Sequence, residues 1–389
     1  MLLRKELNWV IAIGVFLSLL VLGFSLARNK PLWNDEVFTQ TATIDQISYA
    51  DLITEGPAAG ESNACPLFYA IQKIISDIGR YKTPTDWVNN NWDARDVHSQ
   101  IFLRIQPVVF MALAIAVMFY YFSRQYSLWA GLYSLAASLS SYMFWLYWAE
   151  ARPYALWVFL TVLQSVLFLE IIRQKKADPQ KWRWLTLIHI LLALTTILSL
   201  GQIVIVSFLL WLYKEKAFKA YIFLTVLPTC VTLFYSLKVG SRGFYVDGDW
   251  SDFIIPCVPW DRLSVIALYG LLLVALAFLG KSRILSLKEN IHSDGKAFFV
   301  YAVLIILSGL VLLGLFQIRE VPGQGNPISI RYFIYLTPVT IMAATLSVVY
   351  LLKTVKPYRW LFLNLLSGVI GITLFGFFHN CFWVIKLCQ

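Results

Sequence analysis

Long apolar runs constrain this 389-residue chain more than any other feature of its sequence. A helix needs about 20 apolar residues to cross about 30 Å of lipid hydrocarbon, and many windows of this chain meet that length. The chain is 59% hydrophobic and only 14% charged, whereas soluble domains carry about 25% charged residues. These properties exclude a soluble or disordered protein and predict an all-α, polytopic transmembrane helical bundle. The clear predicted spans lie near residues 9–27, 101–123, 128–148, 154–172, 218–236, 262–280, 297–316, 332–352 and 360–385.

The apolar stretch 184–213 is too long for one upright helix. Gly201 and Gln202 interrupt it near the middle, so we expect two short helices that meet near Gly201. The bundle then has about 11 helices. The first apolar run follows Arg4 and Lys5 and lacks a small-x-small cleavage site, which indicates a retained signal anchor.

The distribution of charge supports this division and gives the expected orientation. With the N-terminus in the cytoplasm, 18 lysines and arginines fall on the inner side, and 7 fall on the outer side beyond the first loop. Treating 184–213 as one span would place Lys214, Lys216 and Lys219 outside and remove this asymmetry. The outer side also holds 16 of the 22 acidic residues. The net charge of +10 therefore follows membrane topology, and no nucleic-acid partner is expected.

Residues 28–100 form a large first extracytoplasmic loop, and its apolar stretches 44–53 and 65–78 are too short to span. In the second stretch, apolar residues recur at helical spacing, which predicts an interfacial helix with its polar residues turned to water. No linker or internal repeat is visible, so we expect one membrane domain over residues 1–389, without a soluble C-terminal domain. In the interfacial helix the apolar set is Leu67, Ala70, Ile71, Ile74, Ile75 and Ile78, and the polar set is Gln72, Lys73, Ser76 and Asp77.

Asp35 and Glu36 place two adjacent carboxylates directly after the first predicted span. This position suits a general base for an acceptor hydroxyl, because a partly desolvated carboxylate is a stronger base. The alternative is a solvated turn, or a helix N-cap formed by Asn34 or Asp35.

A second group, Glu150, Arg152 and Tyr154, lies between two predicted spans on the same outer side. Charged side chains at such a junction are costly unless they pair or line a wet cavity. The planar guanidinium of Arg152 suits a phosphate group. The alternative is an ion pair between Glu150 and Arg152 inside an aromatic belt.

Arg331 and Tyr332 open a later span, after a loop rich in glycine and proline. Arg331 is either a snorkelling anchor or an anion clamp assisted by the helix N-terminus. The segment 244–252 combines aromatic residues and carboxylates that suit a sugar, but its composition favours a solvated loop. The four histidines form no cluster and the five cysteines form no CxxC pair, so the sequence indicates neither a zinc site nor a disulfide framework.

The order of these motifs resembles the GT-C superfamily of integral-membrane glycosyltransferases, and more narrowly its bacterial family 39 and aminoarabinose-transferase-like branch. The resemblance covers about residues 1–175, and Arg331-Tyr332 with Pro338 extends it more loosely. Where the family usually has a His and a Pro before its Pro-Leu pair, this chain has Ala64 and Cys65. The matching motifs are Trp33-Asn34-Asp35-Glu36-Val37-Phe38-Thr39, Cys65-Pro66-Leu67-Phe68-Tyr69, Arg104 and Glu150-Ala151-Arg152-Pro153-Tyr154-Ala155-Leu156.

The resemblance implies transfer of a sugar, with inversion, from a polyprenyl-phosphate-linked donor to a hydroxyl of a lipid, glycan or protein. The expected location is the outer face of a bacterial inner membrane. Asp35 is the implied general base, and Glu36 or Glu61 would orient the acceptor or a metal ion. A divalent cation is compatible with these carboxylates, although no spacing in the sequence requires one. The implied substrate-binding residues are Glu61, Tyr69, Arg104, Glu150, Arg152, Tyr154, Arg331 and Tyr332, with Arg152 and Arg331 on the phosphate.

Two other functions remain open at this point. A transporter or flippase of lipid-linked sugars would place charged residues or broken helices near the bilayer midplane and show a repeat between its halves. Few ionisable residues fall within the predicted spans, and the acids gather on one side. A catalytically silent scaffold with the GT-C fold would fit the missing His.

Overall fold

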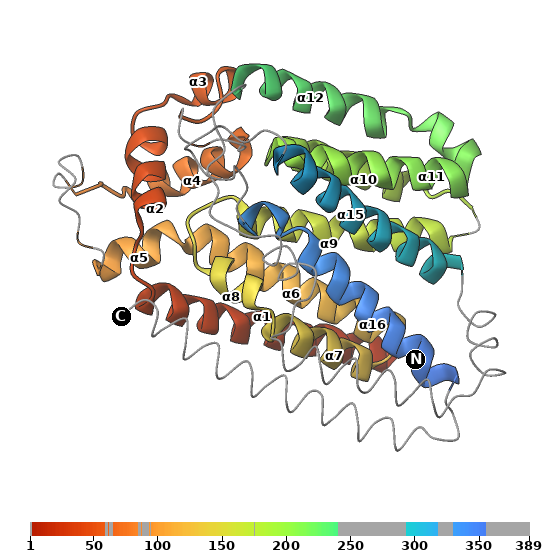
Figure 1. The fold of residues 1–389 in the computed structure, drawn as a ribbon. Coiled ribbons are helices and arrows are strands. Elements are labelled where there is room, and N and C mark those ends of the chain that lie inside the picture. Colours follow the sequence, from red (N-terminus) through yellow and green to blue (C-terminus); the bar gives the residue numbers. More distant parts are fainter. Residues whose placement is uncertain are drawn as a thin grey trace.

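The structure is a computed structural model that describes residues 2–58, 61, 65–84, 87, 93, 95–174, 176–239, 293–317 and 330–354. The described residues form 14 α-helices, a π-helix and short 3-10 turns (Figure 1). The predicted spans near 262–280 and 360–385, and the segment 244–252, lie outside the described residues. Five segments of the described part are long and apolar enough to cross a membrane, namely Asn8–Asn29, Ile105–Gln125, Tyr154–Arg173, Ile197–Ala220 and Asp294–Leu312.

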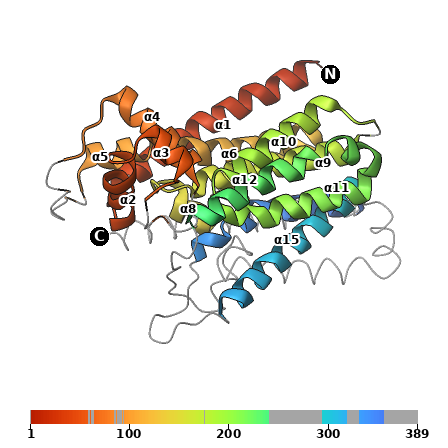
Figure 2. The same ribbon diagram turned by 90° about the horizontal axis from the view of Figure 1, so that it is seen from above.

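The centre of the bundle is α9 (Tyr154–Arg173), which is buried along most of its length. On one side it packs against α6 (Ile105–Gln125), which also contacts α1 (Leu2–Asn29) and α7 (Leu128–Leu139). On the other side lie α10 (Pro179–Ala193), α11 (Leu200–Ala220) and α12 (Phe223–Val239). The later helices α15 (Ser293–Gln317) and α16 (Leu336–Thr354) also pack on α9. Figure 2 shows α1 and α15 on opposite sides of the bundle.

The predicted span 128–148 is divided into two helices, α7 and α8 (Tyr142–Trp148). The break lies at two serines that satisfy backbone groups locally. Ser140 Oγ donates to Ala137 O at 2.9 Å, and Ser141 Oγ accepts from Phe144 N at 3.3 Å as the N-cap of α8. Because serine side chains compete for backbone hydrogen bonds, they end one helix here and begin the next.

The stretch 184–213 is divided as expected, but the break lies before Gly201. α10 ends at Ala193, a 3-10 turn covers Ile197–Ser199, and α11 starts at Leu200. Two backbone amides from the first loop account for this position, since Cys65 N donates to Thr195 O at 3.0 Å and Leu67 N to Leu194 O at 2.9 Å. The second helix is also longer than expected, reaching Ala220 through non-helical geometry at Lys214.

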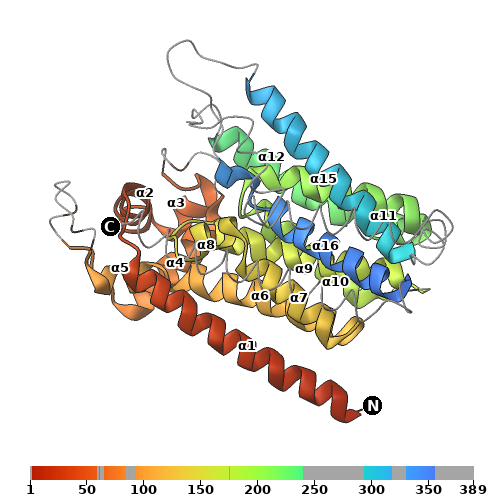
Figure 3. The same ribbon diagram turned by 60° about the horizontal axis from the view of Figure 1, so that its bottom comes forward.

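The long loop after the first span folds onto one end of the bundle as five short elements. These are α2 (Asn34–Phe38), the π-helix η1 (Thr39–Ile44), α3 (Tyr49–Thr54), α4 (Pro66–Gly79) and α5 (Val97–Leu103). Tyr235 OH at the end of α12 donates to Ile53 O at 2.7 Å and ties α3 to the bundle. The beginning of α1 lies at the opposite end (Figure 3).

The predicted helix exists as α4. The expectation that its polar residues face water was wrong for Gln72 and Ser76, whereas Asp77 is exposed as expected. Gln72 and Ser76 are 1% and 5% exposed, whereas Ile74 and Ile78 are 47% and 80% exposed. α4 packs its polar side on η1, where Lys73 Nζ donates to Ile44 O at 2.5 Å. Its exposed isoleucines are therefore available to lipid.

Candidate active site

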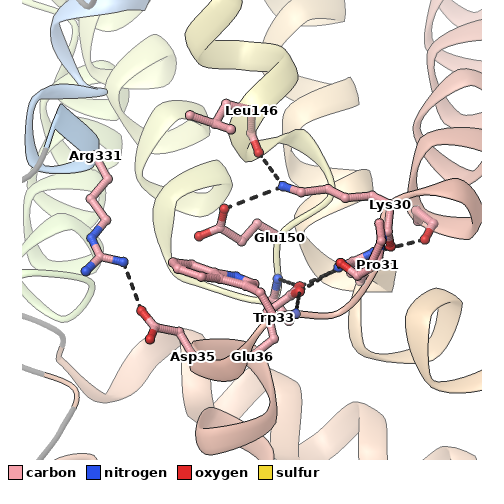
Figure 4. A network of polar contacts seen from close by, with 11 residues as sticks. Lys30, Pro31, Trp33, Asp35, Glu36, Leu146, Glu150 and Arg331 are labelled. Atoms are coloured by element: carbon pink, nitrogen blue, oxygen red, sulfur yellow. Dashed lines mark hydrogen bonds and ion pairs between the residues drawn. The ribbon is translucent and has the colours of Figure 1, made fainter. Parts of the chain in front are cut away.

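Asp35 on α2 meets two arginines from distant parts of the chain. Its Oδ2 lies 2.9 Å from Arg331 Nη1 (Figure 4). The same oxygen lies 4.0 Å from Arg152 Nη2. The Asp35 side chain is 34% exposed, so it is accessible at this end of the bundle. The arrangement combines an accessible carboxylate with two cations that could also bind an anion.

Two aromatic rings contact the Arg331 guanidinium in addition to its ion pair with Asp35. It lies in the 3-10 turn Ile330–Phe333 before α16, and its guanidinium carbon is 5.6 Å from the ring centroids of both Trp33 and Tyr332. Among the described residues, its Nε has no hydrogen-bond partner. Tyr332 is 8% exposed, so it supports Arg331 from the buried side.

Arg152 belongs to a buried cluster around Glu61. Glu61 Oε1 accepts from Thr39 Oγ1 at 2.6 Å, and its Oε2 accepts from Tyr69 OH at 2.7 Å and from Arg152 Nη1. Arg152 Nη1 also donates to Thr39 Oγ1 at 2.9 Å. Burial and the nearby Glu61 carboxylate raise the pKa of Tyr69, so the phenol remains a neutral donor. Glu61 therefore orients Arg152 and is already occupied by three donors.

Glu36 requires a correction, because its carboxylate does not face the exposed side of the site. It is fully buried and accepts from Arg104 Nε at 2.8 Å, Arg104 Nη2 at 2.5 Å, Ala151 N at 2.7 Å and Trp33 N at 3.3 Å. Burial alone would raise the pKa of Glu36. The Arg104 guanidinium and the other donors outweigh burial, so the pKa of Glu36 lies below its ordinary value. The pair with Arg104 fastens α2 to the junction of α5 and α6, and the bond from Ala151 N fastens it to the segment that carries Arg152. Both side chains are fully buried.

Arg104 is likewise a buried structural centre rather than a substrate contact. It is 0% exposed and donates to the carbonyls of Ala27 at 3.0 Å, Pro31 at 2.8 Å and Lys30. These carbonyls belong to the end of α1 and the turn that follows it. Arg104 therefore sets the path of the chain from the first span into α2.

Glu150 lies beside these groups and is only 3% exposed. Its Oε2 is 3.6 Å from Lys30 Nζ, which also donates to Leu146 O at 2.7 Å (Figure 4). Its Oε1 has no hydrogen-bond partner among the described residues. Burial raises the pKa of Glu150 to about 7, although Lys30 acts in the opposite direction. The expected alternative pairing of Glu150 with Arg152 is not formed, because Arg152 pairs with Glu61 and Asp35.

The predicted site residues thus gather at one end of the bundle. Tyr154, the first residue of α9, is 4% exposed and lies with its ring centroid 5.0 Å from that of Tyr147. It forms part of the buried floor, since its hydroxyl group has little access to solvent.

Comparison with known proteins gives a structural match only. The fold is similar to that of ArnT. The crystal structure of ArnT from Cupriavidus metallidurans in the apo state matches with a TM-score of 0.58 and 11% identity, over 98% of this chain and 77% of that one. The structure of the same protein bound to undecaprenyl phosphate matches with a TM-score of 0.52 and 12% identity, over 95% and 62% of the two chains. No family model matches the sequence, and no curated protein matches it. At this level of identity, the likeness to ArnT shows a shared fold.

Three residues contribute to the candidate site although the sequence analysis did not predict them as site residues. Lys30 pairs with Glu150, Thr39 donates to Glu61, and the Trp33 ring lies against Arg331. Thr39 had a usable signal, because it follows Asp35 by four residues and one helical turn places such residues on the same face. Lys30 had no such signal in the sequence, since a cation at the end of a span is typical of an ordinary snorkelling anchor.

The donor set does not favour a metal ion here. The described residues include no group of three or more His, Cys, Asp or Glu side chains that could hold one. The oxygens of Glu36 and Glu61 are occupied by arginine, amide and hydroxyl donors.

Proposed function

We propose that the protein is a membrane glycosyltransferase that moves a sugar from a polyprenyl-phosphate-linked donor to an acceptor hydroxyl at the outer membrane face. Asp35 acts as the general base, and Arg331 and Arg152 bind the phosphate. The observation that carries the proposal is the position of Asp35 between these two arginines. The structural similarity to ArnT, which has been solved with undecaprenyl phosphate bound, supports this class of ligand.

The geometry suggests an exchange of counterions. In the structure, Asp35 pairs with Arg331 at 2.9 Å and lies 4.0 Å from Arg152, which Glu61 also pairs with. A donor phosphate would compete for the same guanidinium groups, for which arginine forks are well suited. Once the phosphate holds the arginines, the Asp35 carboxylate is free to accept a hydrogen bond from the acceptor hydroxyl.

The reaction then follows a single displacement. The acceptor oxygen attacks the anomeric carbon, its proton passes to Asp35, and the bond from that carbon to the phosphate oxygen breaks. The electron pair leaves with the polyprenyl phosphate, which gains negative charge. Arg331 and Arg152 stabilise that charge as it develops, which is the electrostatic contribution expected of fixed cations in a partly dry site. Attack from the side opposite the leaving group inverts the anomeric centre.

The test uses the full chain, purified and reconstituted in liposomes. The donors are undecaprenyl-phosphate-linked sugars in which the sugar is radiolabelled. The acceptors are a panel of lipids, glycans and peptides. We expect release of undecaprenyl phosphate and transfer of the radiolabelled sugar to at least one of these acceptors. Movement of intact donor across the bilayer without cleavage would instead indicate a transporter or flippase. Binding without either activity would indicate a silent scaffold.

A further inference from the structure

Three residues of the candidate site carry unpartnered polar atoms, and these atoms describe what a ligand must supply. Arg152 Nε and Arg331 Nε are buried donors without a partner among the described residues, and Glu150 Oε1 is a buried acceptor without one. Buried polar atoms in folded proteins are nearly always hydrogen-bonded, so each exception calls for a partner. Two free donors match an anion, whereas a free carboxylate oxygen matches a hydroxyl group.

The free oxygen is the one that Lys30 does not approach. Lys30 Nζ lies 3.6 Å from the other oxygen, Oε2, and Figure 4 shows the rest of the carboxyl group turned away from Lys30. Trp33 is 37% exposed, and the Arg331 guanidinium lies over its ring. Arg331 and Arg152 both act electrostatically on Glu150, so a ligand that reaches Glu150 would also lie close to the proposed phosphate-binding arginines.

We propose that Glu150 is a specificity-determining residue whose Oε1 accepts a hydrogen bond from a hydroxyl of the transferred sugar. This inference rests on the proposed function and assigns the part of the site that recognises the sugar rather than the phosphate. A polyprenyl-phosphate-linked polyol supplies both partners at once, an anion for the arginines and a hydroxyl for Glu150.

The electrostatic surroundings agree with this assignment. The charged groups that act on Glu150 are Lys30, Glu36, Arg152 and Arg331. Burial outweighs the three cations and raises the pKa of Glu150 to about 7. A hydroxyl donor would stabilise the charged carboxylate and offset part of the cost of burying it.

Binding measurements separate the sugar from the phosphate. The probes are undecaprenyl phosphate alone and undecaprenyl phosphate carrying glucose, mannose or galactose. In Glu150→Leu we expect affinity for at least one sugar-loaded carrier to fall about tenfold to a hundredfold, the range for a hydrogen bond to a charged group. Affinity for the bare carrier should stay unchanged or become slightly tighter, since a negative charge has been removed.

Two further variants complete the design. Glu150→Gln keeps the shape and one acceptor oxygen, so it should lose less affinity than Glu150→Leu and remains informative if the leucine variant fails to fold. Asp77→Asn is the matched control, because that carboxylate accepts from Tyr49 OH at 2.6 Å on the exposed side of α4. It should change neither affinity.

Equal losses for bare and sugar-loaded carriers, or no loss for any of the three sugars, would overturn the assignment of Glu150. Failure of the proposed function looks different. In that case the wild-type protein would not bind bare undecaprenyl phosphate, and Arg331→Gln would make no difference.

Discussion

At the scale of single residues, the neighbouring carboxylates Asp35 and Glu36 have different tasks. Successive residues on a helix point about 100° apart. Asp35 therefore reaches Arg331, whereas Glu36 points inward to Arg104. The sequence indicated that this pair was important, but it could not assign the roles, because the partner of Asp35 lies 296 positions away. The packing of the 3-10 turn Ile330–Phe333 and α16 against the rest of the bundle brings that partner close.

The Glu36–Arg104 pair yields a stability prediction. Arg104→Met leaves a fully buried carboxylate without its cation, which should cost about 3–5 kcal/mol of unfolding free energy. Adding Glu36→Gln to that variant should recover part of the loss. Thermal unfolding in detergent measures both effects.

A pair in a different setting serves as the control. Lys219 and Glu215 lie 2.6 Å apart, with side chains 69% and 57% exposed, so Lys219→Met should hardly change the midpoint. Equal midpoints for wild type and Arg104→Met would show that the buried pair is not what holds α2 in place.

Glu150 yields a prediction about pH. Its pKa rises from 4.5 to about 7 on folding, so between these values the folded protein holds a proton that the unfolded chain has released. Stability should therefore fall as pH rises from about 4.5 to 7, by at most about 3 kcal/mol from this group. The difference in unfolding free energy between wild type and Glu150→Gln, followed across this range, isolates the contribution. A difference independent of pH would mean that Glu150 titrates normally.

At the scale of helices, close contacts decide stability, and one of them depends on a glycine. A Cβ at Gly131 of α7 would lie 2.8 Å from Phe119 O and would also overlap Ser123 Oγ of α6. Gly131→Ala should therefore separate α6 from α7 and cost about 1–3 kcal/mol. Gly14 of α1 has nothing within 4 Å of such an atom, so Gly14→Ala should be neutral or stabilising through helix propensity. Equal changes in the unfolding midpoints of Gly131→Ala and Gly14→Ala, each relative to wild type, would contradict this account.

Helix positions were more predictable than helix breaks and faces. Long apolar runs gave the spans at α1, α6, α9 and α15, because apolar length alone determines them. The break before Gly201 depends on Cys65 and Leu67, which donate from a distant loop. The buried face of α4 depends on its contact with η1, a partner that amphipathic spacing does not reveal.

At the scale of the whole molecule, two ends of the bundle should lie on opposite sides of the membrane. One end carries the loop of residues 28–100, and the other carries Lys214, Lys216 and Lys219. The positive-inside rule predicts that Lys216 is cytoplasmic and Lys82 is outside, and both residues are exposed. In a background without native cysteines, Lys82→Cys in intact cells should react with a membrane-impermeant maleimide. Lys216→Cys should react only after the cells are permeabilised. The reverse pattern would place the candidate site in the cytoplasm.

The central claim is that Asp35, set between Arg331 and Arg152, removes the acceptor proton during sugar transfer. The most direct measurement is single-turnover transfer by purified Asp35→Asn with the undecaprenyl-phosphate sugar that the wild-type protein uses. Loss of a positioned base should slow the chemical step about 10²-fold to 10⁴-fold, while undecaprenyl phosphate still binds through the two arginines. Transfer at the wild-type rate by this variant would contradict the account.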